Sequence, residues 1–387
     1  MKNNKLLIIL GCLGVYLLTA GASYMYFSNQ SSASSTVITG KVDNDYGALA
    51  FDDGKPKTES CPLNGVKYSK DQEKWWQTHR PLGVMIENSV DARPQSGLSF
   101  ADVVYEAVAE GGITRFLSVF YCQDAGFVGP VRSARTYFLD FISEYGAFPL
   151  YAHVGGANTP GKANALGQIV DYGWSVYNDL NQFSIGFPTF KRDESRLGRS
   201  VATEHTMYST TRALWDVGKD RGLTNKDEDG ASWDESFVEY TFKNDASVSE
   251  RGKSQIVDVD FWTSQPNFSV EWVYDPATNL YMRSVGGDKH LDNNTKKQLS
   301  AKNVVILYMS EARANDGYEG NLHLLYGTKG TGDAVIFQDG KQIKGEWSKD
   351  DRESRTLLTD ASGKKISFNR GVIWFQIVPD DSPISVK

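Results

Sequence analysis

The segment Leu82-Gly83-Val84-Met85-Ile86 decides the fold, because it is a short apolar run that predicts a buried β-strand. Residues 113–121 and 148–154 are rich in β-branched and aromatic residues and predict two more strands. Helical patterns alternate with these strands, over residues 99–110 and 133–144, from residue 159 onward, and over 210–222. The alternation indicates an α/β domain with a mixed central sheet over residues 79–224.

The chain changes character after residue 224. Residues 225–234 are polar and acidic and are typical of a linker. Short strand-like runs follow at hairpin spacing, and Asp339-Gly340 is a strong two-residue turn signal between two of them. The expected strands cover residues 237–242, 255–262, 270–274, 280–285, 304–309, 322–326, 334–337, 341–347, 356–358, 365–368 and 372–378. They predict an all-β domain over residues 233–387, either a sandwich or an open barrel.

The N-terminus predicts a membrane segment within residues 1–28. Lys2 and Lys5 precede a mainly apolar stretch over residues 6–27, which is long enough for a single transmembrane helix with the remaining chain outside the cytoplasm. A cleaved signal peptide is the alternative, because Ala20-Gly21-Ala22 has the small-x-small cleavage pattern. Residues 29–78 then form a flexible linker. Cys61 and Cys122 lie in a compartment that permits disulfides, so they are either bridged or two unpaired buried residues.

The charge of the chain excludes some functions. Among 387 residues there are 41 Lys and Arg against 48 Asp and Glu, a formal net charge of −7, which argues against a nucleic-acid partner. The basic residues are unevenly divided, however. The region from Arg80 to Arg212 contains nine Arg and two Lys, whereas the rest of the chain contains seven Arg and twenty-three Lys. Arginine binds phosphate or carboxylate bidentately, so this bias predicts either an anion site or arginine–carboxylate pairs within the domain.

The placement of the arginines favours an anion site. Arg132 and Arg135 lie where a loop enters a predicted helix, and cations there are better tolerated if an anion is bound. Arg115 on the preceding strand and the basic run around Arg192 add to the set, and phosphate is favoured over carboxylate because so many guanidinium groups are available. His153, before two glycines, and His205 are candidates for a ligand or a general acid, with a structural histidine as the alternative. The expected ligand-binding residues are Arg93, Arg115, Arg132, Ser133, Arg135, His153, Arg192 and His205.

Metal binding is a second possibility on the predicted helix over residues 99–110. Asp102, Glu106 and Glu110 follow a spacing of four residues and would form one ridge, with Asp102 and Glu106 as candidate ligands for Mg²⁺ beside a phosphate. A solvated or arginine-paired helix face is the alternative.

Tryptophans of the predicted β domain suggest a different site. Core packing is the favoured interpretation, because Trp272 and Trp374 lie within apolar strands. The alternative is a glycan-binding platform formed by five exposed-looking tryptophans: Trp233, Trp262, Trp272, Trp347 and Trp374.

Several motifs resemble those of the YerB-like lipoprotein family, two-domain bacterial envelope proteins of unknown function. The motifs are Ile86-Glu87-Asn88, Ala92-Arg93-Pro94-Gln95-Ser96-Gly97-Leu98, Glu110-Gly111-Gly112-Ile113-Thr114-Arg115-Phe116 and Gly129-Pro130-Val131-Arg132-Ser133-Ala134-Arg135. Looser matches, such as Trp272-Val273-Tyr274-Asp275, extend the resemblance to about residue 379. The resemblance implies an architecture rather than a reaction. This chain lacks the family's usual lipobox cysteine, which favours a protein anchor over a lipid one.

A fainter similarity concerns the LytR-CpsA-Psr phosphotransferases, extracellular enzymes that bind polyprenyl-pyrophosphate glycans through arginines and Mg²⁺-holding aspartates. It rests on Arg132-Ser133 at the start of a helix and on a strand that ends in Gly155-Gly156. Ala134 stands where their Arg-Ser-Asp-Thr pattern has Asp, a departure that weighs against metal-assisted catalysis.

These observations predict a membrane-anchored, extracytoplasmic envelope protein. It binds an anionic, phosphate-bearing ligand of the cell wall or a lipid-linked glycan through the arginines. The alternative is a phosphotransferase or hydrolase that acts on polyprenyl-pyrophosphate-linked glycans, in which the arginines stabilise phosphoryl charge and Asp102 holds Mg²⁺. A structural or partner-binding role for the β domain is a third reading, and the sequence leaves open whether the chain is an enzyme.

Overall fold

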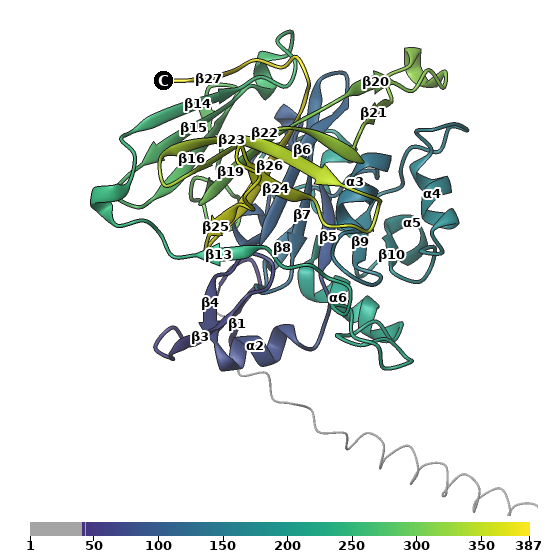
Figure 1. The fold of residues 1–387 in the computed structure, drawn as a ribbon. Helices are drawn as coiled ribbons and strands as arrows, with labels where there is room; N and C mark the ends of the chain where they lie inside the picture. Colours follow the sequence, from purple (N-terminus) through teal and green to yellow (C-terminus); the bar gives the residue numbers. More distant parts are fainter. Residues whose placement is uncertain (1–40, 43) are drawn as a thin grey trace, which may run out of the picture. The chain divides into compact units, whose positions relative to one another are not determined.

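The computed structural model describes residues 41–42 and 44–387, and its central element is a ten-stranded mixed sheet (Figure 1). The strands of this sheet are, in spatial order, β10 (Asp179–Asn181), β9 (Leu150–His153), β5 (Leu82–Glu87), β7 (Ile113–Phe120), β6 (Val103–Glu110), β26 (Ile373–Pro379), β19 (Asn303–Met309), β22 (Gly330–Gln338), β23 (Lys341–Lys349) and β24 (Leu357–Asp360). The predicted mixed sheet is therefore confirmed, and residues from both predicted domains belong to it.

The two halves of this sheet meet where β6 and β26 run side by side in parallel. Their register pairs Ile373 with Val103 and Gln376 with Glu106. The next strand, β19, is also parallel to β26, so three neighbouring strands point the same way. Because each of these strands has neighbours on both sides and is covered on both faces, their residues are almost all buried.

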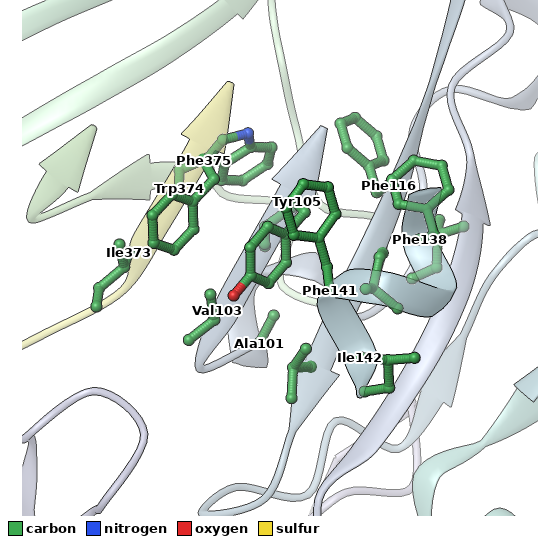
Figure 2. Packing of buried hydrophobic residues seen from close by; sticks show 14 of the residues in the cluster. Ala101, Val103, Tyr105, Phe116, Phe138, Phe141, Ile142, Ile373, Trp374 and Phe375 are labelled. Carbon is green, nitrogen blue, oxygen red and sulfur yellow. The ribbon is translucent and has the colours of Figure 1, made fainter. Parts of the chain in front are cut away.

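A helix and a second sheet cover opposite faces of this junction. On one face, α3 (Thr136–Ile142) packs its aromatic side chains on the sheet, and the Tyr105 ring is stacked between Phe141 and Phe375 at centroid distances of 4.8 and 4.7 Å (Figure 2). Gly83 allows this close approach, since a Cβ there would lie 2.6 Å from the Ile142 Cδ1. A six-stranded sheet covers the other face. Five of its strands lie in the order β17 (Asp288–Lys289), β16 (Leu280–Val285), β15 (Val270–Asp275), β14 (Gln255–Val259) and β27 (Ile384–Val386), and the sixth, β18 (Ser300–Ala301), pairs with β16.

Short elements complete the described part of the chain. The remaining helices are α2 (Lys70–Trp76), α4 (Ala165–Asp171), α5 (Gln182–Ile185) and α6 (Thr211–Asp220). The remaining strands form small sheets: β1 (Lys41–Val42) with β2 (Leu49–Ala50), β3 (Lys57–Ser60) with β4 (Lys67–Ser69), β8 (Phe127–Val128) with β12 (Met207–Thr210) and β11 (Lys191–Arg192), β13 (Thr241–Lys243) with β25 (Ser367–Asn369), and β20 (Glu311–Arg313) with β21 (Leu324–Tyr326).

The helix predicted over residues 99–110 is wrong, because this segment forms strand β6. Its residues Val103, Val104, Ala107 and Val108 fit a helical face, but the segment is buried on both sides, so its hydrophobic pattern has no clear period. Pairing with β7 on one side and β26 on the other decides the structure. The helices predicted over 133–144, after 159 and over 210–222 correspond to α3, α4 and α6.

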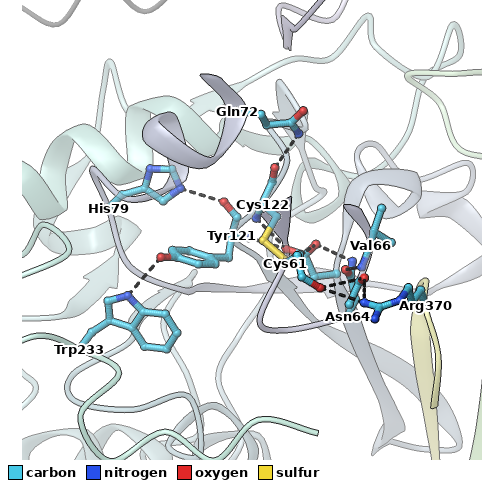
Figure 3. The surroundings of a disulfide bond; sticks show 12 residues. Cys61, Asn64, Val66, Gln72, His79, Tyr121, Cys122, Trp233 and Arg370 are labelled. Atoms are coloured by element: carbon cyan, nitrogen blue, oxygen red, sulfur yellow. Dashed lines mark hydrogen bonds between the residues drawn. A yellow bond between two sulfur atoms is a disulfide. The ribbon is translucent and has the colours of Figure 1, made fainter. Parts of the chain in front are cut away.

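A disulfide joins Cys61 to Cys122, with their Cα atoms 6.0 Å apart, so the bridged alternative is confirmed (Figure 3). The bond attaches the segment that carries β3, β4 and α2 to the end of β7. Hydrogen bonds add to this attachment: the Gln72 Nε2 donates to the Cys122 carbonyl at 2.8 Å, and His79 Nε2 lies 2.9 Å from the Tyr121 carbonyl. Much of the predicted linker over residues 29–78 is therefore ordered.

The predicted transmembrane anchor lies in residues 1–28, outside the described residues. Among the residues that the structure describes, no helix is both long and apolar enough to cross a bilayer.

Removal of the disulfide tests its contribution to stability. The double substitution Cys61→Ala/Cys122→Ala opens a link between residues 61 positions apart, which should lower the free energy of unfolding by about 4 kcal/mol. Denaturant titration of the variant and the wild type measures this difference. Cys12→Ala, which removes the third cysteine, is the control and should leave the midpoint unchanged. Equal midpoints for the double variant and the wild type would contradict the expectation.

Candidate functional site

Three of the predicted arginines meet at the end of the central sheet where the parallel strands β5 and β9 finish. The segment around Arg132 lies between these strands: the Arg132 N–H donates to the Met85 carbonyl at 2.9 Å, and the Val154 N–H donates to the Arg132 carbonyl at 3.0 Å. Arg115 is paired with Glu87 across the adjoining antiparallel strands β5 and β7. Crevices beyond the carboxyl ends of parallel strands are common ligand sites, so the position suits a binding function.

Two of these arginines share one carboxylate of the protein itself, that of Glu110. The Arg115 Nη2 lies 3.2 Å from the Glu110 Oε2, and Arg135 forms an ion pair with the other oxygen of Glu110. The Arg115 Nη1 also donates to the Ser133 carbonyl at 2.8 Å. The anion predicted at the start of α3 is thus supplied by Glu110, and the arginine–carboxylate alternative holds for this pair.

Arg132 is the most accessible member of the cluster, with 27% of its side chain exposed. Its Nε lies 3.3 Å from the Glu87 Oε1, and the His205 Nδ1 lies 2.9 Å from the Glu87 Oε2. One carboxylate therefore faces both a guanidinium and an imidazole. We define the arginine cluster as Arg115, Arg132 and Arg135 together with their carboxylate partners Glu87 and Glu110.

Burial shapes the electrostatics of the arginine cluster. It lowers the pKa of Arg115 and of Arg132, and in both cases the nearby Glu87 opposes this shift. Within the cluster, three guanidinium groups face two carboxylates, and Glu204 adds a negative charge near Arg132 from outside the cluster. In addition, the Arg135 Nε and the Tyr151 hydroxyl are buried without a hydrogen-bond partner among the described residues. Buried polar groups are normally paired, so an additional acceptor at this position would satisfy them.

His153 lies behind the cluster rather than in an accessible crevice. It is fully buried, its Nε2 lies 2.5 Å from the Asp179 Oδ1, and its Nδ1 lies 2.6 Å from the Gly155 carbonyl. Both ring nitrogens are therefore engaged within the protein. This geometry favours a histidine that holds β9 and β10 together, which was the structural alternative.

The other predicted ligand residues have separate partners. The Arg93 Nε donates to the Asn88 Oδ1 at 3.1 Å, and its guanidinium lies 5.1 Å from the centre of the Phe268 ring. Arg192 is exposed on β11 and binds the turn over residues 203–206, including the Thr206 Oγ1 at 3.2 Å. The backbone of Ser133 contacts Arg115, and its side chain is partly exposed. Arg192 thus adjoins the turn that carries His205, whereas Arg93 belongs to a different network.

That different network is a buried ion pair between Glu106 on β6 and Arg283 on β16. Both side chains are fully buried, and the Arg283 Nη2 lies 2.9 Å from the Glu106 Oε2. The Trp374 Nε1 and the Thr114 Oγ1 also donate to Glu106, at 3.2 and 2.9 Å. The guanidinium of Arg283 lies 4.8 Å from the Trp374 ring and 5.2 Å from the ring of Trp272. The pair therefore joins the two sheets inside an aromatic enclosure.

A chain of hydrogen bonds connects this ion pair to the sequence motifs. The Arg283 Nε donates to the His290 Nδ1 at 3.0 Å, and the His290 Nε2 in turn lies 2.7 Å from the Gln95 Oε1. The Gln95 Nε2 donates to the Asn88 Oδ1, the same atom that Arg93 binds. Asn88, Arg93 and Gln95 of the sequence motifs are thus structural. Arg283 was not among the residues predicted from the sequence. The signal that could have indicated it is a charged residue inside an otherwise mainly apolar, strand-like run.

Asp102 and Glu106 do not form the expected ridge, because their segment is a strand. Four residues of extended chain separate them by about 13 Å, which is too far for ligands of one ion. Asp102 instead accepts hydrogen bonds from the N–H groups of Tyr121 and Cys122, at 2.7 and 3.0 Å, and from the Asn64 Nδ2 at 2.7 Å. Cys61 and Cys122 lie close to Asp102, but the disulfide occupies both sulfur atoms.

The chain matches the models of a protein family and is similar to a bacterial protein. The model "Protein of unknown function (DUF3048) N-terminal domain" matches residues 65–224, and "Protein of unknown function (DUF3048) C-terminal domain" matches residues 257–375. A Bacillus subtilis protein named "Putative lipoprotein YerB" is 30% identical over 331 residues, which cover 86% of this chain and 89% of that protein. The crystal structure of the YerB protein from Bacillus subtilis has a TM-score of 0.67 at 25% identity and covers 85% of this chain and 100% of that one.

The fold and these matches define a two-domain, β-rich protein whose domains have no assigned function. The chain belongs to the DUF3048 family, which confirms the resemblance to the YerB-like proteins. The predicted two-domain architecture is also confirmed, although the domains share the central sheet.

Substitution of Arg283 tests the buried ion pair. Arg283→Met leaves the Glu106 carboxylate buried without its cation, which should lower the free energy of unfolding by about 3–5 kcal/mol. Arg283→Met/Glu106→Gln removes both charges and should recover part of this loss. Denaturant titration of both variants measures the two effects. If Arg283→Met were as stable as the wild type, the ion pair would not make the expected contribution to the free energy of unfolding.

The acidity of Asp102 gives a pH-dependent prediction. Burial raises the pKa of Asp102 from 3.8 to about 7, although the N–H groups of Cys122 and Tyr121 oppose this shift. Between pH 3.8 and about pH 7, Asp102 is protonated in the folded state and ionised in the unfolded state, so the free energy of unfolding falls as the pH rises. Between about pH 5 and pH 8 the wild type should lose about 2–3 kcal/mol more than Asp102→Asn. Denaturant titrations at both pH values check this, and equal losses would contradict it.

Proposed function

We propose that this chain is a membrane-associated, extracytoplasmic envelope protein that binds a phosphate-bearing ligand at the arginine cluster. The observation that carries the proposal is the excess of guanidinium groups over carboxylates at the carboxyl ends of β5 and β9. Arg132 is the contact residue, because it is partly exposed and, within the described residues, forms its salt bridge with Glu87 alone. Arg135 and Tyr151 supply further donors beneath it.

Phosphate suits this arrangement better than a carboxylate. A phosphate offers several acceptor oxygens, so it can engage the forked donors of one arginine and further donors at the same time. Arg115 and Arg135 already hold the Glu110 carboxylate, which offsets one of their two positive charges. A ligand therefore binds mainly through Arg132 and competes with Glu87 for it. The cell wall and lipid-linked glycans are the sources of such phosphate groups that fit the proposed location.

Three observations support the location. The relative from Bacillus subtilis is named a lipoprotein, which describes a membrane-attached protein. Residues 6–27 of this chain are apolar and follow Lys2 and Lys5, and we propose that they form a single-pass anchor in the cytoplasmic membrane. The Cys61–Cys122 disulfide is compatible with a compartment outside the cytoplasm.

The proposed function is therefore binding of the phosphate-bearing ligand without catalysis. In the alternative, a phosphotransferase or hydrolase on polyprenyl-pyrophosphate-linked glycans, Asp102 would hold Mg²⁺ near the arginines. Asp102 instead lies at the opposite end of β6 from Glu110, eight residues of extended chain or about 26 Å away. At this distance Asp102 is too far from the arginines to hold a metal ion beside them, which weighs against the metal-dependent reaction.

The binding experiment titrates the purified chain with farnesyl pyrophosphate, with and without Mg²⁺, and with farnesol as the ligand that lacks phosphate. Arg132→Ala should weaken binding of the pyrophosphate about tenfold or more, because it removes a charge-assisted contact. Farnesol should show much weaker binding that the substitution leaves unchanged. Isothermal titration calorimetry measures the affinities, and phosphate release reports any hydrolysis.

Arg199→Ala is the matched control, because Arg199 is an exposed arginine of the same region that pairs with Asp91. It should leave the affinity for pyrophosphate unchanged. Equal affinity of Arg132→Ala and the wild type would remove the proposed site. Release of phosphate by the wild type but not by Arg132→Ala would replace the binding function with the enzymatic alternative.

A further inference from the structure

A cavity of about 500 Å³ lies at the same end of the central sheet, on the side of β19 and β26. Its lining comes from the residues after β14, from the start of β20 and from the turn between β26 and β27. Small-molecule sites typically have volumes of 300–1,000 Å³, so this cavity is large enough for a sugar unit.

Trp262 provides the aromatic wall of the cavity. The other four tryptophans considered as a glycan platform are buried in the core, whereas Trp262 is partly exposed. Its Nε1 donates to the Glu311 Oε1 at 3.0 Å, and the hydroxyl of Tyr326 binds the other oxygen of Glu311. The indole ring is therefore held in a fixed orientation at the cavity wall.

The polar groups of the cavity are acids and hydroxyls. Glu311, Asp380 and Asp381 contribute three carboxylates, and Ser264 and Ser310 are among the hydroxyls. Among the described residues that line the cavity, none is a lysine or an arginine. Burial raises the pKa of Glu311, whereas the hydrogen bonds from Tyr326 and Trp262 lower it; of the nearby charges, that of Asp381 raises this pKa and that of Arg313 lowers it. A phosphate would be repelled here, whereas a cation would be attracted.

We propose that this cavity binds a saccharide that carries a protonated amine. The apolar face of the sugar ring packs on the Trp262 indole, its ammonium group faces Asp380 and Asp381, and its hydroxyls bond to the serines. An aromatic ring and carboxylates both attract an ammonium group, so the two kinds of wall select the same ligand. This site is separate from the arginine cluster, and the proposal does not depend on phosphate binding there.

The two sites are close enough to share neighbours. Tyr137 packs on Tyr326 with ring centres 4.9 Å apart, and Tyr326 binds Glu311 at the cavity. On its other side, Tyr137 stands near Arg115 and Arg135. Burial raises the pKa of Tyr137, the charges of the two arginines oppose this shift, and the charge of Glu311 adds to it. A glycan that bears both a phosphate and an amino sugar could therefore contact both sites.

The test titrates the purified chain with a glucosamine trisaccharide and with its N-acetylated counterpart, which lacks the charged amine. The amine form should bind at least about tenfold more tightly, and Trp262→Ala should weaken it about tenfold. Asp380→Asn/Asp381→Asn changes only exposed side chains and should remove the preference for the amine form. This second variant keeps the test valid if Trp262→Ala fails to fold.

Glu228→Gln/Asp229→Asn is the matched control, because it removes two exposed acids that do not line the cavity. It should bind both trisaccharides as the wild type does. Equal affinity for the two trisaccharides, no binding of either, or unchanged binding in Asp380→Asn/Asp381→Asn would overturn the proposal. Loss of pyrophosphate binding in Arg132→Ala with retained trisaccharide binding would show that the two sites act separately.

Discussion

The buried ion pair between Arg283 and Glu106 is the constraint on which the rest of the structure depends. An unpaired charge inside a protein is strongly destabilising, so the packing of β16 on β6 that brings these two groups together is favoured over other registers. The surrounding tryptophans and the hydrogen bonds from Trp374 and Thr114 fix the pair further. The network then runs through His290 and Gln95 to the loop after β5, which leads back to the arginine cluster.

The sequence predicted strands and helices best where their patterns were unambiguous. The apolar run around Val84 and the helix before Gly222 were predicted in the right places. Residues 103–110 were predicted as a helix because apolar residues on both faces erase the difference between periods of two and 3.6. The shared sheet also could not be predicted, because pairing of β6 with β26 joins residues about 270 positions apart, and no local pattern encodes such a contact.

The arginine bias had two physical causes that composition could not separate. Arg115, Arg132 and Arg135 do meet, as their placement in the motifs suggested, but two of them bind Glu110. Arg93 serves the network between the sheets, and Arg196 packs on the Phe127 ring while its Nε donates to the Ser96 Oγ at 2.8 Å. Arginine is suited to both uses, because the same planar guanidinium binds an external anion or an internal acceptor. The two uses can be distinguished only by where each guanidinium group lies in the folded protein.

The parallel pairing of β26 with β6 has a consequence for how the protein reaches its folded state. β26 follows β6 by about 270 residues, so this edge of β6 has no partner until those residues have emerged. Contacts between such distant residues form slowly, and an exposed strand edge can pair with other chains. The N-terminal half therefore completes its sheet only once β26 has been synthesised, and a chain that ends before residue 373 keeps an edge open to aggregation.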